Sequence, residues 1–308
     1  MRYNRLSLMK FLDALSERVL VAEGAMGTRL LSKGVATGEC LEALNLSNRA
    51  LIREIHEEYR QAGAEICKSN TFGANVVRLG RHGLAAKCRE MNIAGVEIAK
   101  EVAGTDGFVA GVAGPMGTRA GTRAEARWMF ALQMESLAEG GADFILLETF
   151  QNLNELEAAI HAAREVCELP IVAQVSPDEQ GHLEGGIGPE IYVAKLNGWG
   201  VDAMGCNCGA NLASMLDAFG RMALLTDKPL TAQPAAGIPF IQGGRTVYPC
   251  LPEEMADAAG QFAESGARIV GGCCGATPEH IAAIRAALPR NFRVHSRSQR
   301  PGPSCRIM

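Results

Sequence analysis

The sequence predicts an α/β protein that folds as a single-domain (β/α)8 barrel, the TIM barrel. Short apolar runs bounded by glycine alternate with longer stretches of helical spacing, which is the pattern of βα units around a parallel sheet. Eight such runs occur, and a closed barrel of this type has eight strands. A glycine-containing phrase precedes several of the runs and marks the end of a helix. An open, doubly wound sheet shows the same alternation and is the alternative fold.

The eight expected strands share a short, apolar or β-branched character, and a candidate helix follows each of them. In chain order they are residues 19–22, 65–68, 108–112, 144–147, 171–174, 202–205, 229–233 and 268–271. The glycine phrase is QAGA at 61–64, EGGAD at 139–143, NGWGVD at 197–202 and ESGAR at 264–268. Glycine just after a helix accepts the left-handed backbone that ends it, so each phrase predicts a turn from helix to strand.

Composition excludes several classes of protein. The 308 residues are 47% hydrophobic, which is too apolar for disorder and sufficient for one large core. No apolar stretch reaches the roughly 18 residues of a membrane-spanning helix. The net charge of −4 gives no general attraction to nucleic acid or to an anionic membrane. Charged residues interrupt the N-terminal segment, so we expect no signal peptide, a cytoplasmic location and reduced thiols for the ten cysteines.

One domain is expected to span residues 1–290, followed by a basic, solvated tail at 291–308. In such a barrel, catalytic residues lie at the C-terminal ends of the strands. Acidic, amide and thiol groups follow the expected strands of this chain. The segments are EGAMGT at 23–28, SNTFGAN at 69–75, AGPMG at 113–117, ETF at 148–150, VS at 175–176, CNCG at 206–209, PAAGIP at 234–239 and GCCG at 272–275. We expect these groups to converge on one rim.

The thiols are the most informative of these groups. Cys273 and Cys274 end the last strand between two glycines that let both sulfurs face one point, and Cys208 ends the sixth strand. Three thiolates without a fourth ligand predict a zinc site with one open position, as in catalytic zinc. Cys206 shares a face of the strand with Cys208, so the residue spacing leaves both as candidates. A strained disulfide between Cys273 and Cys274 is a further alternative.

The remaining cysteines are expected to be small core residues. They are Cys40, Cys67, Cys88, Cys167, Cys250 and Cys305.

Together these motifs resemble the zinc-dependent homocysteine S-methyltransferase domain. That domain occurs in cobalamin-dependent methionine synthase, in betaine-homocysteine methyltransferase, and as the N-terminal half of bacterial bifunctional homocysteine S-methyltransferase/methylenetetrahydrofolate reductases. The resemblance covers roughly residues 10–290 and is carried by segments 23–28, 70–75, 148–149, 207–208 and 271–278. The segment LEALNLSN at 41–48 is most similar to the bifunctional subgroup.

The resemblance implies that Cys208, Cys273 and Cys274 hold the zinc and carry the catalysis, with the substrate thiol as fourth ligand. It implies that Glu23 and Glu148 hold the amino group of homocysteine. The other residues expected in the substrate site are Gly24 and Ala25, whose backbone receives the carboxylate, and Thr149, Asn70 and Asn207.

Two positions depart from the family pattern. The acid after the first strand is usually Asp, so Glu23 is one methylene longer, and the seventh-strand motif usually has Asn where this chain has Ala235. Asn70 could also be a helix N-cap, because an Asn-Thr pair after a strand is ordinary capping chemistry. Asn207, beside a ligand, is expected to orient the metal or the donor.

A metal turns a thiol, whose ordinary pKa is about 8.5, into a thiolate at neutral pH. Three protein thiolates keep the fourth sulfur electron-rich enough to attack a methyl group on a sulfonium, a quaternary ammonium or cobalt. The sequence therefore predicts methyl transfer to homocysteine, giving methionine. Methylation of another thiol and a zinc-binding or thiol-redox regulatory barrel without turnover are the alternatives. A metal-dependent hydrolase normally uses His and carboxylate ligands, whereas His56, His82 and His161 are expected in or between helices.

The methyl donor is not specified by the sequence. The chain has no Asp-x-His-x-x-Gly cobalamin signature, no second barrel for folate and no reductase half after residue 290. The expected donors are a small molecule (S-adenosylmethionine, S-methylmethionine or a betaine) or a methyl group carried by a separate corrinoid or folate protein. The chain could also be one part of a longer protein.

Overall fold

The expected runs form one parallel eight-stranded sheet in the computed structural model, which describes residues 5–117, 122–209 and 211–288. Its strands are β1 (Leu20–Val21), β2 (Ile66–Lys68), β3 (Phe108–Ala113), β4 (Phe144–Phe150), β5 (Ile171–Val175), β6 (Ala203–Cys208), β7 (Leu230–Pro234) and β10 (Ala267–Val270). Each of the eight predicted runs overlaps one of these strands, so the prediction of strand number and order is confirmed.

The sheet closes into a barrel. Its strands follow the order β1, β10, β7, β6, β5, β4, β3, β2, and every neighbouring pair is parallel. A parallel bridge between Ala22 and Ile66 joins β1 to β2, with the Glu65 amide donating to the Val21 carbonyl at 2.7 Å. The TIM barrel is thus confirmed, and the alternative of an open sheet is wrong.

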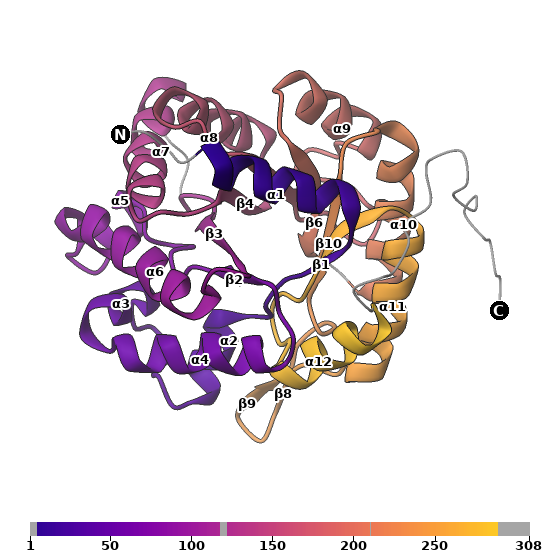
Figure 1. Cartoon of the computed structure of the whole chain (residues 1–308), viewed down its shortest axis with the longest axis horizontal. Coiled ribbons are helices and arrows are strands. Elements are labelled where there is room, and N and C mark those ends of the chain that lie inside the picture. Colours follow the sequence, from indigo (N-terminus) through magenta and orange to yellow (C-terminus); the bar gives the residue numbers. More distant parts are fainter. Residues whose placement is uncertain (1–4, 118–121, 210, 289–308) are drawn as a thin grey trace.

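Helices surround the barrel (Figure 1). They are α1 (Arg5–Glu17), α2 (Met26–Ser32), α3 (Leu44–Ser47), α4 (Arg49–Gln61), α5 (Val76–Gly80), α6 (Cys88–Ala103), α7 (Arg123–Glu139), α8 (Leu153–Val166), α9 (Pro189–Gly198), α10 (Leu212–Leu225), α11 (Pro252–Glu264) and α12 (Pro278–Ala287), with short 3-10 turns η1 (Leu41–Ala43) and η2 (Ala85–Lys87). The predicted glycine turns occur where these helices end: the φ of Gly63 is +100° and that of Gly266 is +106°, and Gly141 and Gly200 are also positive. Left-handed backbone of this kind favours glycine, which explains the recurring phrase.

Helix α1 closes the N-terminal end of the barrel, an element that the sequence pattern did not predict. Its Phe11 stacks on Phe144 of β4, with ring centroids 4.0 Å apart, and meets Phe108 of β3 edge-on. These rings belong to the cluster that fills the barrel interior together with Leu20 and Ile66. Figure 1 shows α1 lying across the barrel. The C-terminal end of the barrel therefore remains open for a functional site.

Strands β4 and β6 are longer than predicted. Phe150 still pairs with Val175, and Cys208 pairs with Pro234, so both strands stay hydrogen-bonded to their neighbours up to the rim. Glu148 therefore lies among the last residues of β4 rather than after the strand, and Cys208 is the last residue of β6. Glu148 and Cys208 are consequently held by the sheet rather than by a loop, which fixes their positions more tightly.

The loop after β7 carries a two-stranded antiparallel hairpin, β8 (Phe240–Gln242) and β9 (Arg245–Val247), which the sequence pattern also did not predict. It projects from the edge of the barrel (Figure 1). None of the helices in the described ranges is both long and apolar enough to cross a bilayer. The tail predicted at 291–308, including Cys305, lies outside the described residues.

Candidate functional site

Three sulfurs converge at the C-terminal end of the barrel. Cys208 is the last residue of β6, and Cys273 and Cys274 follow β10. Their sulfur atoms all lie within 4.8 Å of one another, and the Sγ atoms of Cys208 and Cys274 are 3.7 Å apart. All three cysteines carry free thiols. The structure thus brings the three predicted ligands together as a candidate metal site.

The backbone at Cys208 separates it from Cys206. Cys208 has a φ of +54°, a left-handed value that is uncommon for a residue other than glycine. Because this conformation breaks the alternation of the strand, Cys208 points to the rim while Cys206 stays in the core cluster between the sheet and the helices. Burial raises the pKa of Cys206 to about 12. The sulfur cluster therefore contains Cys208 and excludes Cys206.

The segment after β1 supports the turn that carries Cys273 and Cys274. The Gly272 amide donates to the Glu23 carbonyl, and the Ala25 amide donates to the Ala276 carbonyl, both at 3.3 Å. The Gly275 amide donates to Thr28 Oγ1 at 3.1 Å. The EGAMGT segment thus supports the turn of the paired cysteines through hydrogen bonds. The sequence alone did not predict this structural role.

Within this segment, Gly24 packs closely against Ala276 and Tyr59. A Cβ atom at Gly24 would lie 2.5 Å from the Ala276 carbonyl oxygen and 2.9 Å from the ring of Tyr59. We expect Gly24→Ala to lower the free energy of unfolding by about 1–3 kcal/mol, because the backbone has to move to admit the methyl group. The matched control is Gly27→Ala: Gly27 lies in α2, where a Cβ would meet only a Leu41 methyl group at 3.5 Å.

Urea denaturation of the two variants measures this difference. Gly27→Ala is expected to keep or raise stability by up to about 1 kcal/mol, since alanine is the better helix former. A Gly24→Ala protein as stable as Gly27→Ala would contradict the close packing of the EGAMGT segment against the cysteine turn.

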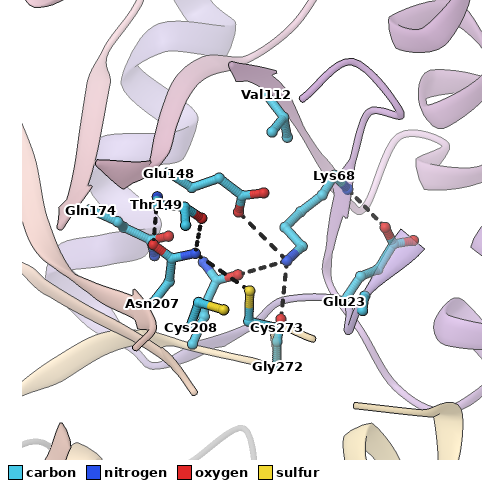
Figure 2. A network of polar contacts seen from close by, with 12 residues as sticks. Glu23, Lys68, Val112, Glu148, Thr149, Gln174, Asn207, Cys208, Gly272 and Cys273 are labelled. Carbon is cyan, nitrogen blue, oxygen red and sulfur yellow. Dashed lines mark hydrogen bonds and ion pairs between the residues drawn. The ribbon is translucent and has the colours of Figure 1, made fainter. Parts of the chain in front are cut away.

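Asn207 connects three parts of the site. Its Oδ1 accepts a hydrogen bond from the Thr149 amide at 2.7 Å, and its Nδ2 donates to Thr149 Oγ1 at 2.8 Å and to Cys273 Sγ at 3.5 Å (Figure 2). Thr149 has a φ of +67°, and the strand register shifts between Leu147 and Phe150. Asn207 therefore holds both this irregular backbone and one of the three sulfurs, and its role in orienting the metal or the donor stays a prediction.

Glu148 and Lys68 meet inside the rim. Lys68, from β2, donates to Gln233 Oε1 at 3.0 Å and to the Gly272 carbonyl at 3.1 Å, and its Nζ is 3.8 Å from Glu148 Oε2 (Figure 2). Burial raises the pKa of Glu148 to about 7, an effect that the Lys68 charge opposes and Cys273 reinforces.

The sulfur cluster by itself favours a single thiolate. Hydrogen bonds from Cys208 and Cys273 lower the pKa of Cys274 to about 3. Hydrogen bonding to Cys273 and Cys274 raises the pKa of Cys208 well above its ordinary value. Further negative charges in one small volume repel each other, so ionisation of all three thiols calls for a cation between them.

Glu23 points away from the sulfurs. Both of its carboxylate oxygens accept from His56 Nδ1 of α4, at 2.9 and 3.0 Å, and one also accepts from the Lys68 amide at 2.8 Å. The ligand atoms of Glu23, His56 and Cys67 also lie within 4.8 Å of one another, and all three residues are buried. In this structure the carboxylate is thus bound to its own chain, and its role toward an amino group stays a prediction. His56 lies in helix α4, as expected, and its ring is the hydrogen-bond partner of the Glu23 carboxylate.

The Asn70 side chain hydrogen-bonds to its own chain, and its place in the substrate site stays a prediction. Its Nδ2 donates to the Leu41 carbonyl at 2.9 Å and to Asn45 Oδ1 at 3.0 Å. The N-cap in this segment is Asn75, which accepts from the amides of Val77 and Arg78. Asn70 therefore fixes the loop after β2 to η1 and α3, and the capping alternative for Asn70 is wrong.

Two residues at the rim, Lys68 and Tyr248, were not predicted from the sequence. Lys68 is two positions after the inward-facing Ile66, so strand alternation already placed it in the barrel interior. Tyr248 lies in the loop after β9, with its ring against Gly275. Burial and the neighbouring Cys274 raise the pKa of Tyr248 to about 12. No local sequence signal marks Tyr248.

Fold and site define a class of protein, a (β/α)8 barrel with a thiol-rich candidate metal centre at its catalytic end. The family model for homocysteine S-methyltransferase matches residues 20–288. Methionine synthase of Mycobacterium tuberculosis is 34% identical over 302 residues, which are 90% of this chain and 25% of that protein. The chain thus spans about a quarter of the length of that relative.

Solved structures agree with this match. The metallated form of the homocysteine methyltransferase MmuM from Escherichia coli is 28% identical, with a TM-score of 0.77 over 91% of this chain and 99% of that one. Its oxidized form is 29% identical, with a TM-score of 0.73 over 87% and 95% of the two chains. The chain belongs to the homocysteine S-methyltransferase family. The family resemblance expected from the motifs is confirmed.

Proposed function

We propose that this protein transfers a methyl group to the thiol of L-homocysteine, forming methionine, at a zinc ion held by Cys208, Cys273 and Cys274. The observation that carries the proposal is the convergence of three sulfurs within 4.8 Å of one another, beside a buried acid, at the catalytic end of the barrel. The described cluster supplies three ligands, which leaves the fourth position of a tetrahedral site for the substrate.

The sulfur positions fit zinc. Tetrahedral zinc with Zn–S bonds of about 2.3 Å requires sulfurs roughly 3.8 Å apart. The Cys208 and Cys274 sulfurs are 3.7 Å apart, and the third sulfur lies within the same small volume. When bound, zinc supplies Lewis acidity that keeps a substrate thiol ionised at neutral pH. Thiolate ligands persist in a reducing compartment, which supports the cytoplasm as the place of action.

The residues of the chain bind and orient the substrate. Glu148, buried at the rim, is placed to receive the amino group, and Asn207 keeps the Cys273 sulfur in position. In the transfer, the substrate sulfur forms a bond to the methyl carbon, and the bond between that carbon and the donor breaks with its electron pair staying on the donor. The thiol would lose its proton to solvent on binding the zinc, before this step, so no separate general base is needed.

The candidate donors are S-adenosylmethionine, S-methylmethionine, a betaine, or a methyl group carried by a separate corrinoid or folate protein. We expect the zinc-loaded protein to form methionine from homocysteine with one of these donors, and dialysis against a chelator to abolish the reaction. Mass spectrometry with a deuterated methyl donor follows the transfer. Retained transfer after zinc removal would overturn the role of the metal. Binding of homocysteine without transfer from any donor would favour a regulatory barrel.

A further inference from the structure

Lys68 is a buried cation at the rim that the proposed function does not yet use. It is 7% exposed, and its side chain crosses the barrel interior from β2 to Gln233 of β7 and the Gly272 carbonyl beyond β10 (Figure 2). A buried ammonium needs acceptors for all three of its N–H groups, because each unmatched donor costs free energy. Lys68 makes two hydrogen bonds within the described part of the chain.

The third N–H of Lys68 and one carboxylate oxygen of Glu148 both lack a hydrogen-bond partner among the described residues. The distance between Lys68 Nζ and Glu148 Oε2 is 3.8 Å, which is an ion pair but too long for a hydrogen bond. Glu148 Oε2 is buried and has no hydrogen-bond partner among the described residues. One donor with positive charge and one acceptor with negative charge thus lie next to each other, each with capacity for one more partner.

This pair is complementary to the head group of an amino acid. A zwitterion offers a carboxylate that accepts from an ammonium and an ammonium that donates to a carboxylate, so it can complete both groups at once. The backbone site expected for the substrate carboxylate is already partly used, because the Ala25 amide donates to the Ala276 carbonyl.

We propose that Lys68 binds the carboxylate of the thiol substrate while Glu148 binds its amino group, so that the pair selects a zwitterionic thiol. This inference refines the proposed function and depends on it. The Lys68 charge also offsets part of the negative charge that three thiolates, Glu148 and the substrate carboxylate bring to one rim.

Three thiols test this assignment: homocysteine, 4-mercaptobutyrate, which lacks the amino group, and 3-aminopropane-1-thiol, which lacks the carboxylate. Calorimetry measures their binding to the zinc-loaded wild type and to Lys68→Met. We expect Lys68→Met to bind homocysteine and 4-mercaptobutyrate about 10–100-fold more weakly, since a hydrogen bond to a charged group is lost. Binding of 3-aminopropane-1-thiol is expected to change by less than about threefold, and Lys68→Arg is expected to restore part of the preference for the carboxylate.

Gln233→Leu is the matched control, because it removes one acceptor of Lys68 and keeps the positive charge. It is expected to retain the preference for thiols that carry a carboxylate. Zinc content and thermal denaturation establish that each variant is folded. An equal loss of affinity for all three thiols in Lys68→Met would show a purely structural Lys68 and overturn the assignment, as would unchanged homocysteine binding.

The wild type gives a test that does not depend on the folding of a variant. If it bound 3-aminopropane-1-thiol as tightly as homocysteine, Lys68 would not bind the carboxylate. If it bound none of the three thiols, the proposed function itself would fail.

Discussion

Replacing Cys208 by alanine is expected to remove zinc and methyl transfer together, whereas replacing Cys206 by alanine is expected to leave both in place. Loss of groups that only support metal ligands costs about 10–100-fold in metal affinity. Loss of a ligand itself is therefore expected to exceed about 100-fold. Cys208 lies within 4.8 Å of the other two sulfurs, while Cys206 lies in the core cluster behind the strand.

The two variants form a matched pair, since each removes one sulfur from β6. Metal analysis of the purified proteins and competition with a chromophoric chelator give the zinc content and affinity, and the methionine assay gives the rate. A Cys208→Ala protein that keeps stoichiometric zinc and full activity would rule out the proposed centre. Loss of zinc from a folded Cys206→Ala protein would instead move the third ligand to Cys206.

Glu148→Gln is expected to lower kcat/KM for homocysteine about 100-fold, because the buried partner of the substrate amino group loses its charge. The pH dependence has a definite sign. The pKa of Glu148 is about 7, so protonation below that pH removes the negative charge and weakens homocysteine binding as the pH falls from 8 to 6. The same inflection is expected to be absent from the Glu148→Gln variant.

Stability provides the control for this variant. The pKa of Glu148 in the folded protein is raised above its ordinary value, so its ionisation opposes folding as the pH rises through 7. Glutamine imitates the neutral form, and Glu148→Gln is therefore expected to be at least as stable as the wild type at pH 8. A homocysteine pH profile that is identical in the two proteins would exclude Glu148 as the amine ligand. Binding of 4-mercaptobutyrate, which has no amino group, is expected to be insensitive to the substitution.

The barrel was predictable because its signals are local. Apolar runs and helix-ending glycines such as Gly63 and Gly266 occur within a few residues of the structure they specify, and the left-handed φ values confirm them. Helix α1 and the hairpin after β7 were missed, since neither follows the repeating βα pattern. The position of Phe11 inside the barrel depends on contacts with Phe108 and Phe144, on strands roughly 100 and 130 residues further along the chain.

The location of the site was predictable from the sequence, but several of its side-chain contacts were not. Parallel strands deliver their C-terminal residues to one rim, so Cys208, Cys273 and Cys274 could be assigned to a common site before any contact was known. The partner of Glu23 could not be assigned in this way. His56 is 33 residues away on a helix, and only the packing of α4 into the core cluster that also contains Val21 and Cys67 brings its ring to the carboxylate.

By itself, the sequence determined the (β/α)8 topology, the family and the group of thiols at the catalytic end, because these follow from period, turn chemistry and residue type. Tertiary structure alone decided that Cys208 rather than Cys206 joins the cluster, that Glu23 pairs with His56, and that Lys68 meets Glu148. The first depends on one left-handed φ angle. The others depend on contacts between elements far apart in the chain, for which no local pattern exists.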